Sequence, residues 1–121
     1  MSGFAPPDFA PLPEPPYYAV IFTAQRAEGD HGYAAMAARM SEMALASPGC
    51  IGMESTRDTG GFGITVSYWR DEASILRWKA DAQHLVAQQL GQDRWYTHYT
   101  LRVAKVERHY AGPTGRKPVA D

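Results

Sequence analysis

Aromatic and imidazole side chains gather in the second half of the chain, around the junction of a predicted strand with a predicted helix. The strand ends in Tyr68 and Trp69, and the helix opens with an acidic pair and carries Trp78 and then His84. Further residues of these types lead into the last predicted strand: Trp95, Tyr96, His98 and Tyr99. A cleft with aromatic walls would hold a planar phenolic ligand. An imidazole, whose pKa lies near working pH, could remove that ligand's proton, so the pattern predicts a small-molecule site with His84 as its base.

The same residues have a structural interpretation, which the sequence leaves open. Each tryptophan could belong to the core, and His84, beside Gln83, could be a solvated surface residue. A metal centre is disfavoured, because the four histidines show no two-apart or four-apart pairing and Cys50 is the only cysteine. We therefore expect no resident metal.

The charge balance argues against partners that need a basic surface. Lys and Arg number 12 against 13 Asp and Glu, for a net charge of -1, so we expect neither nucleic acid nor membrane as a partner. Gly61-Phe62-Gly63 matches the centre of an RNA-recognition strand, but Ile64 and Ser67 replace two of its stacking aromatics. Neither a charged leader nor a long apolar run is present, which makes the cytosol the expected location.

Four segments have the composition of strands. Residues 17–23 form an aromatic and β-branched run whose two faces are both apolar. Residues 50–57 and 62–69 flank a short Gly-bearing connection at 58–61, which is typical of a β-hairpin. The last strand is predicted over residues 99–110, where apolar and polar residues alternate imperfectly.

Two helices are predicted between these strands. From Asp30 onward apolar residues recur at i, i+3 and i+4, and Ser47-Pro48-Gly49 ends this first helix. Asp71 and Glu72 lie where the helix macrodipole favours negative charge and open the second helix. That helix runs to about Lys79, then continues or restarts at Asp81, and stops near Gly91.

Both ends of the chain fall outside the predicted domain. Residues 1–16 contain six prolines. Proline fixes φ and cannot donate to a sheet, so these residues are predicted to form an extended arm, either disordered or packed on a neighbouring subunit. Residues 111–121 lack an apolar period and are predicted to be a flexible tail.

The resulting order, βαββαβ, predicts an α+β fold of the ferredoxin-like type. In this fold a four-stranded antiparallel sheet carries both helices on one face. Because the strand at 17–23 is apolar on both faces, we expect the bare face to meet its copy. The prediction is a homodimer through the sheet faces, a dimeric α+β barrel.

Several short segments together carry a family resemblance: Met36 to Met40, Pro48-Gly49, Glu54-Ser55, Tyr68-Trp69, Asp71-Glu72-Ala73, and the helix with Trp78 and His84. On these segments the chain resembles the antibiotic biosynthesis monooxygenase family of the dimeric α+β barrel superfamily, over Tyr17 to Tyr110. The resemblance implies a homodimer with a pocket between sheet and helices in each protomer. It also implies cofactor-independent oxidation of phenols or hydroquinones to quinones by O₂.

In that chemistry the electron-rich anion of the substrate reduces dioxygen, while the protein desolvates the substrate, takes a proton and orients the attack. In this mechanism residue type suggests that His84 would be the base, that Trp78 and Trp95 would be walls of the pocket, and that Tyr96 or Tyr99 would donate a hydrogen bond to a ring oxygen. Tyr68 is a further candidate for substrate binding. A non-catalytic dimer that binds a small ligand or serves a structural role is the alternative.

Some relatives of this kind degrade haem instead, and the chain departs from their pattern. They use an Asn on the first strand, a Trp on the second helix and an axial His ten residues later. Ten residues after Trp78 stands Gln88, which cannot replace imidazole on iron, and the first strand offers Thr23 and Gln25 but no Asn. Haem is therefore a disfavoured cofactor.

Overall fold

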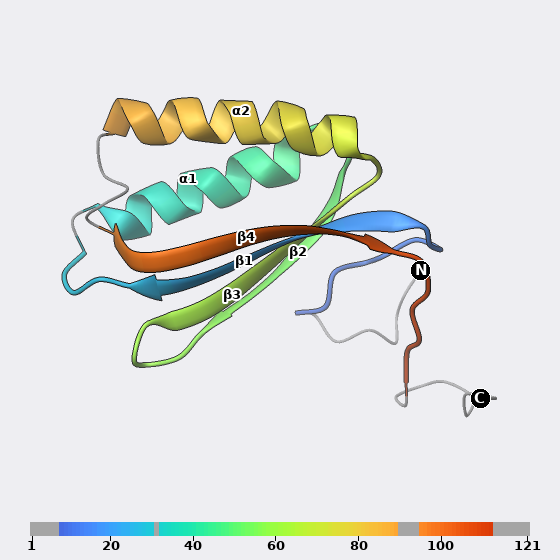
Figure 1. The fold of residues 1–121 in the computed structure, drawn as a ribbon, viewed down its shortest axis with the longest axis horizontal. Helices are drawn as coiled ribbons and strands as arrows, with labels where there is room; N and C mark the ends of the chain where they lie inside the picture. Colours follow the sequence, from blue (N-terminus) through green and yellow to red (C-terminus); the bar gives the residue numbers. More distant parts are fainter. Residues whose placement is uncertain (1–7, 31, 90–94, 113–121) are drawn as a thin grey trace.

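The computed structural model describes residues 8–30, 32–89 and 95–112, except the side chains of residues 84–89. Within these residues the elements follow the order βαββαβ, as Figure 1 shows. Their bounds are β1 Tyr17–Arg26, α1 Tyr33–Ala46, β2 Cys50–Arg57, β3 Phe62–Trp69, α2 Glu72–Gln89 and β4 Tyr96–Val106. The predicted elements are all present, and α2 runs unbroken through Asp81.

The strands form one sheet in the order β2-β3-β1-β4, with every neighbouring pair antiparallel. Both helices cover the same face of this sheet (Figure 1). The predicted ferredoxin-like α+β fold is therefore confirmed. No helix among the described residues is long and apolar enough to cross a membrane.

The last strand lies earlier in the chain than the sequence indicated. It starts at Tyr96, which pairs with Arg26 after a register shift between Gln25 and Arg26. It ends at Val106, because Val106 pairs with Tyr17, the first residue of β1. Pro16 precedes Tyr17 and has no N–H to extend the ladder, so the residues after Val106 find no partner strand.

Local capping interactions fix the helix ends that the sequence predicted. The Oδ1 atom of Asp71 accepts the backbone N–H of Ser74 at 2.8 Å, which satisfies a free donor in the first turn of α2. At the end of α1, the Ser47 hydroxyl donates to the carbonyl of Met43 at 2.7 Å. Gly49 then reverses the chain with φ of +88°, a left-handed conformation that favours glycine.

The face of the sheet opposite the helices is partly covered by the chain's own N-terminal segment. Residues 8–16 run beneath the sheet, and the N–H of Ala10 donates to Oε2 of Glu54 at 2.9 Å (Figure 1). Ala10 also approaches Gly52 so closely that a Cβ there would lie 3.0 Å from the Ala10 Cβ. At this end of the face Tyr17 is only 2% exposed.

The core on the helix side is divided into two clusters. One consists of Val20, Ala44, Trp69 and Ile75, where β1 and β3 meet the end of α1 and the start of α2. The other is centred on Met36 and Trp95, near the start of α1 and the start of β4. Side chains from both clusters border a cavity, described next.

Candidate active site

A cavity of about 810 Å³ lies between the sheet and the helices. This volume lies in the range of about 300–1,000 Å³ that is usual for small-molecule sites. The sheet contributes Val20 and Phe22 of β1, Met53 of β2 and Leu101 of β4. These positions share one face, because Val20 pairs with Val103 and Phe22 pairs with Leu101.

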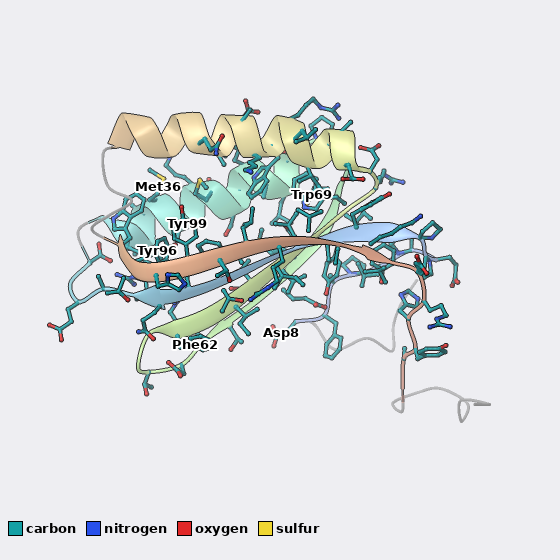
Figure 2. All side chains as sticks on the ribbon, viewed as in Figure 1. Asp8, Met36, Phe62, Trp69, Tyr96 and Tyr99 are labelled. Atoms are coloured by element: carbon teal, nitrogen blue, oxygen red, sulfur yellow. The ribbon has the colours of Figure 1, made fainter. Side chains whose placement is uncertain are left out.

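The helices contribute a methionine-rich wall and an aromatic wall. Met36 and Met40 of α1 line one side, and Trp78 of α2 lines the other. The flexible thioether side chain of Met adapts to ligands of different shapes. Figure 2 shows Met36 between α1 and α2, with Tyr96 and Tyr99 near the start of α1, while Trp69 lies beneath the start of α2.

At the end of the cavity near the β2–β3 hairpin, Arg57 and Tyr33 form a polar group. Arg57 Nη1 donates to the carbonyls of Ala24 and Gly61, and its Nη2 donates to the Tyr33 hydroxyl at 3.3 Å. The guanidinium of Arg26 stacks on the Tyr33 ring, with its Cζ 3.5 Å from the ring centroid. These contacts hold Arg57 and Tyr33 in place at the cavity wall.

Tyr96 extends this polar group. Its ring meets the Tyr33 ring edge to face, with centroids 5.8 Å apart. Burial raises the pKa of the Tyr96 phenol, and the neighbouring Tyr33 raises it further. Tyr96 therefore remains a neutral hydroxyl at physiological pH, able to donate a hydrogen bond but unable to act as a base.

At the other end of the cavity, Trp78 packs against Trp69 with ring centroids 5.4 Å apart. The indole N–H of Trp69 donates to the Ser67 hydroxyl at 2.8 Å. The indole N–H of Trp78 is buried and has no hydrogen-bond partner among the described residues. A buried donor of this kind is costly unless an acceptor reaches it.

Four of the residues predicted to bind substrate line the cavity together: Trp78, Trp95, Tyr96 and Tyr99. Tyr68 lies elsewhere. It pairs with Ala19, on the sheet face away from the helices, and its hydroxyl donates to Oε1 of Glu54 at 2.6 Å. Burial, reinforced by the Glu54 carboxylate, raises the pKa of the Tyr68 phenol. These contacts join Tyr68 to the residue that holds the N-terminal segment.

The predicted base, His84, belongs to α2, but its side chain lies outside the described part of the structure. Its sequence neighbours Ala82 and Gln83 line the cavity. Among the described residues, no group of three or more His, Cys, Asp or Glu side chains could hold a metal ion. Burial raises the pKa of the Cys50 thiol, so it is poorly suited to act as a nucleophile.

Sequence reasoning missed several cavity residues, above all Tyr33, Met36 and Arg57. The i, i+3, i+4 spacing marks Met36 as an apolar helix position and nothing more. Arg57 is followed by Asp58 and a glycine-rich turn, a setting typical of a solvated charge at a hairpin end. Its pairing with Gly63 and its hydrogen bond to Tyr33, the first residue of α1, place it at the cavity.

Comparison with known proteins points in one direction. The family model of antibiotic biosynthesis monooxygenases matches residues 16–90. Uncharacterized protein YqjZ of Bacillus subtilis is 48% identical over 96 residues, which cover 79% of this chain and 84% of that protein. Jasmonate monooxygenase ABM of Pyricularia oryzae is 44% identical over 46 residues, which cover 38% of this chain but only 21% of that protein.

Among solved structures, SnoaB, a cofactor-independent oxygenase from Streptomyces nogalater, shares the fold. The TM-score is 0.60 at 14% identity, and the match covers 82% of this chain and 99% of SnoaB. At this identity the likeness concerns the fold.

Proposed function

This chain belongs to the antibiotic biosynthesis monooxygenase family, and from that premise we propose that it is a cofactor-independent monooxygenase acting on a small phenol or hydroquinone. The observation that carries the proposal is the cavity of about 810 Å³, whose walls are mainly apolar and aromatic. Such a cavity excludes water from a planar aromatic substrate. SnoaB, which shares the fold, is described as a cofactor-independent oxygenase, and a partial relative is named a monooxygenase.

The proposed reaction takes its electrons from the substrate. A phenol loses its hydroxyl proton, and the phenolate transfers electrons to O₂. One oxygen atom bonds to a ring carbon, the O–O bond breaks, and the second oxygen leaves as water, which takes the proton of the ring C–H and the proton first removed from the hydroxyl. The balance is phenol plus O₂ gives quinone plus water, with no external reductant. The protein removes the first proton and holds the anion, the electron-rich form, away from bulk water.

The described residues suit this role in different ways. Trp78 and Trp95 would sandwich or flank the ring, and the neutral hydroxyl of Tyr96 would donate to a substrate oxygen. Tyr99 lies on the same stretch of β4 and packs against Tyr96, with ring centroids 5.8 Å apart. For the proton acceptor we retain His84, on the ground that an imidazole titrates in the working range of pH.

Oxygen uptake by the purified protein tests the proposal across a panel of phenols, hydroquinones and anthrones. We expect uptake above the protein-free blank, one O₂ per quinone formed, and no return of O₂ on adding catalase. Return of half the oxygen would instead indicate release of hydrogen peroxide, which is an oxidase reaction. Saturable binding of the same compounds without uptake above the blank would identify a non-catalytic binding protein.

His84→Ala tests the assigned base. Because general-base catalysis contributes typically ~10²–10⁴-fold, we expect kcat to fall at least a hundredfold with ligand affinity little changed. His98→Ala is the matched control, because His98 lies exposed on β4. Equal kcat values in wild type and His84→Ala would remove His84 from the mechanism.

We also propose that the protein self-associates through the sheet face that the helices leave bare. Ile64 pairs with Thr23 on that face and is 38% exposed, and Phe62, near the hairpin, is also exposed. The N-terminal segment covers the opposite end of the same face, around Tyr17 and Glu54. A second copy could therefore bury the apolar surface left near the hairpin.

A further inference from the structure

We propose that the cavity is built for an organic anion, an elongated aromatic carboxylate whose carboxyl group binds Arg57. That this ligand is also the substrate rests on the function proposed above. The binding claim itself rests on the charges, donors and shape of the cavity.

The charged residues that line the cavity have one sign. Among its described residues, Arg57 and Lys79 are cationic, and neither Asp nor Glu is present. The whole chain, in contrast, carries a net charge of -1. Lys79 is exposed, whereas Arg57 is half-buried and has no counter-charge among these described residues. Against apolar walls this favours an anionic occupant at Arg57, because attraction is stronger where water is excluded.

Arg57 is held in place without being neutralised. Its recorded partners, the carbonyls of Ala24 and Gly61 and the hydroxyl of Tyr33, are all neutral acceptors. A guanidinium has five N–H donors in a fixed fork, and a carboxylate accepts two of them side by side. Tyr96, whose ring packs edge to face against Tyr33, lies beside this group and lines the same cavity.

The opposite end of the cavity requires a different group on the ligand. Trp78 contacts Trp69, the last residue of β3, whereas Arg57 pairs with Gly63, near the first residue of that strand. The paired indole rings make that end suited to the aromatic part of the ligand, remote from the carboxylate.

Between these two ends the walls are mainly apolar. Val20 and Phe22 contribute to the floor, and Met36 and Met40 form the side. The ligand that fits these regions is an apolar ring system with a carboxylate at one end. Arg57 would thus select the substrate and set its direction in the cavity.

Isothermal titration with a matched pair of ligands, anthracene-2-carboxylate and anthracene-2-carboxamide, tests the inference. The two differ in charge and scarcely in shape. We expect wild-type protein at neutral pH to bind the carboxylate at least about tenfold more tightly, which corresponds to about 1.4 kcal/mol. Because the comparison uses unmodified protein, it does not depend on a variant that folds. Equal affinities would overturn the inference.

Variants then assign the preference to one residue. Arg57→Gln should reduce the carboxylate-to-amide ratio to near one, while Arg57→Lys should retain part of it. Arg39→Gln is the matched control, because Arg39 is exposed on α1 and does not line the cavity. Loss of the preference in Arg39→Gln, or its full retention in folded Arg57→Gln, would contradict the role of Arg57.

These ligands lack a phenol, so their binding is independent of oxygen chemistry. Oxygen uptake with neutral phenols, combined with equal binding of acid and amide, would leave the proposed function standing and refute the anion site. A strong carboxylate preference without oxygen uptake on any phenolic carboxylate would support the anion site and refute the proposed monooxygenase function.

Discussion

Replacing Gly49 by alanine should destabilise the fold at the joint that positions α2 over the cavity. Gly49 has φ of +88°, and its carbonyl accepts the N–H of Arg70 at 2.8 Å, where β3 leads into α2. A Cβ at Gly49 would lie 2.0 Å from Oγ and 2.5 Å from Cβ of Ser74, which is itself buried. The turn and the first turn of α2 therefore meet with no room for a methyl group.

Two separate costs follow from this geometry. A left-handed backbone costs an L-residue about 1–2 kcal/mol. Overpacking a buried contact adds about 1–3 kcal/mol, because Ser74 must move with the start of α2. We therefore expect Gly49→Ala to lower the free energy of unfolding by about 2–5 kcal/mol, a large part of the total for a small domain.

Gly32→Ala separates the two costs. Gly32 has nearly the same φ, +84°, but a Cβ there would have nothing within 4 Å. Gly32→Ala should therefore lower the free energy of unfolding by the backbone cost alone, about 1–2 kcal/mol. Urea unfolding followed by tryptophan fluorescence measures both variants against wild type. Losses that agree within about 0.5 kcal/mol would refute the close contact between Gly49 and Ser74.

Two further predictions concern assembly and pH. Ile64→Lys puts a charge on the bare sheet face and should shift the protein towards monomer, as measured by light scattering after size exclusion. Leu76→Lys is the control, because Leu76 lies on α2 and is 67% exposed, and it should leave the mass unchanged. An unchanged mass for both variants would count against the proposed interface. The N–H and hydroxyl of Ser74 hold the pKa of Asp71 below its usual 3.8. The ionised Asp71 carboxylate therefore stabilises the folded state fully above pH 3.8, and this stabilisation is lost as the pH falls through the lowered pKa of the folded protein. The stability difference between wild type and Asp71→Asn in urea should therefore shrink in acid, and a difference independent of pH would contradict this assignment.

The fold was predictable because its signals are local. The aromatic and β-branched run at Tyr17, the hairpin at Asp58 to Gly61 and the cap at Asp71 each specify an element from a few neighbouring residues. The bounds of β4 were not predictable in this way. They depend on which residues of β1 remain to be paired, and hence on Pro16, about ninety residues away along the chain.

The cavity was predictable only in part, and Tyr68 illustrates why. Consecutive strand residues point to opposite faces, so Tyr68 and Trp69 could not both face the helices. The sequence alone does not say which of the two does, because both side chains are large and aromatic. The pairing of Trp69 with Tyr18, on the same face as Val20, decides between them and leaves Tyr68 beside Glu54.

The division of the core explains how so small a domain keeps a cavity open. Ala44, Trp69 and Ile75 fasten the helices to the sheet at one end, while Met36 and Trp95 pack at the other. Each cluster holds its end of the helices against the sheet, and side chains of both border the cavity. At the hairpin end of the cavity, Arg57 can present its charge to a ligand because carbonyls of the hairpin and of β1 hold it. The interactions that keep the two ends closed are thus separate from those that would select the ligand.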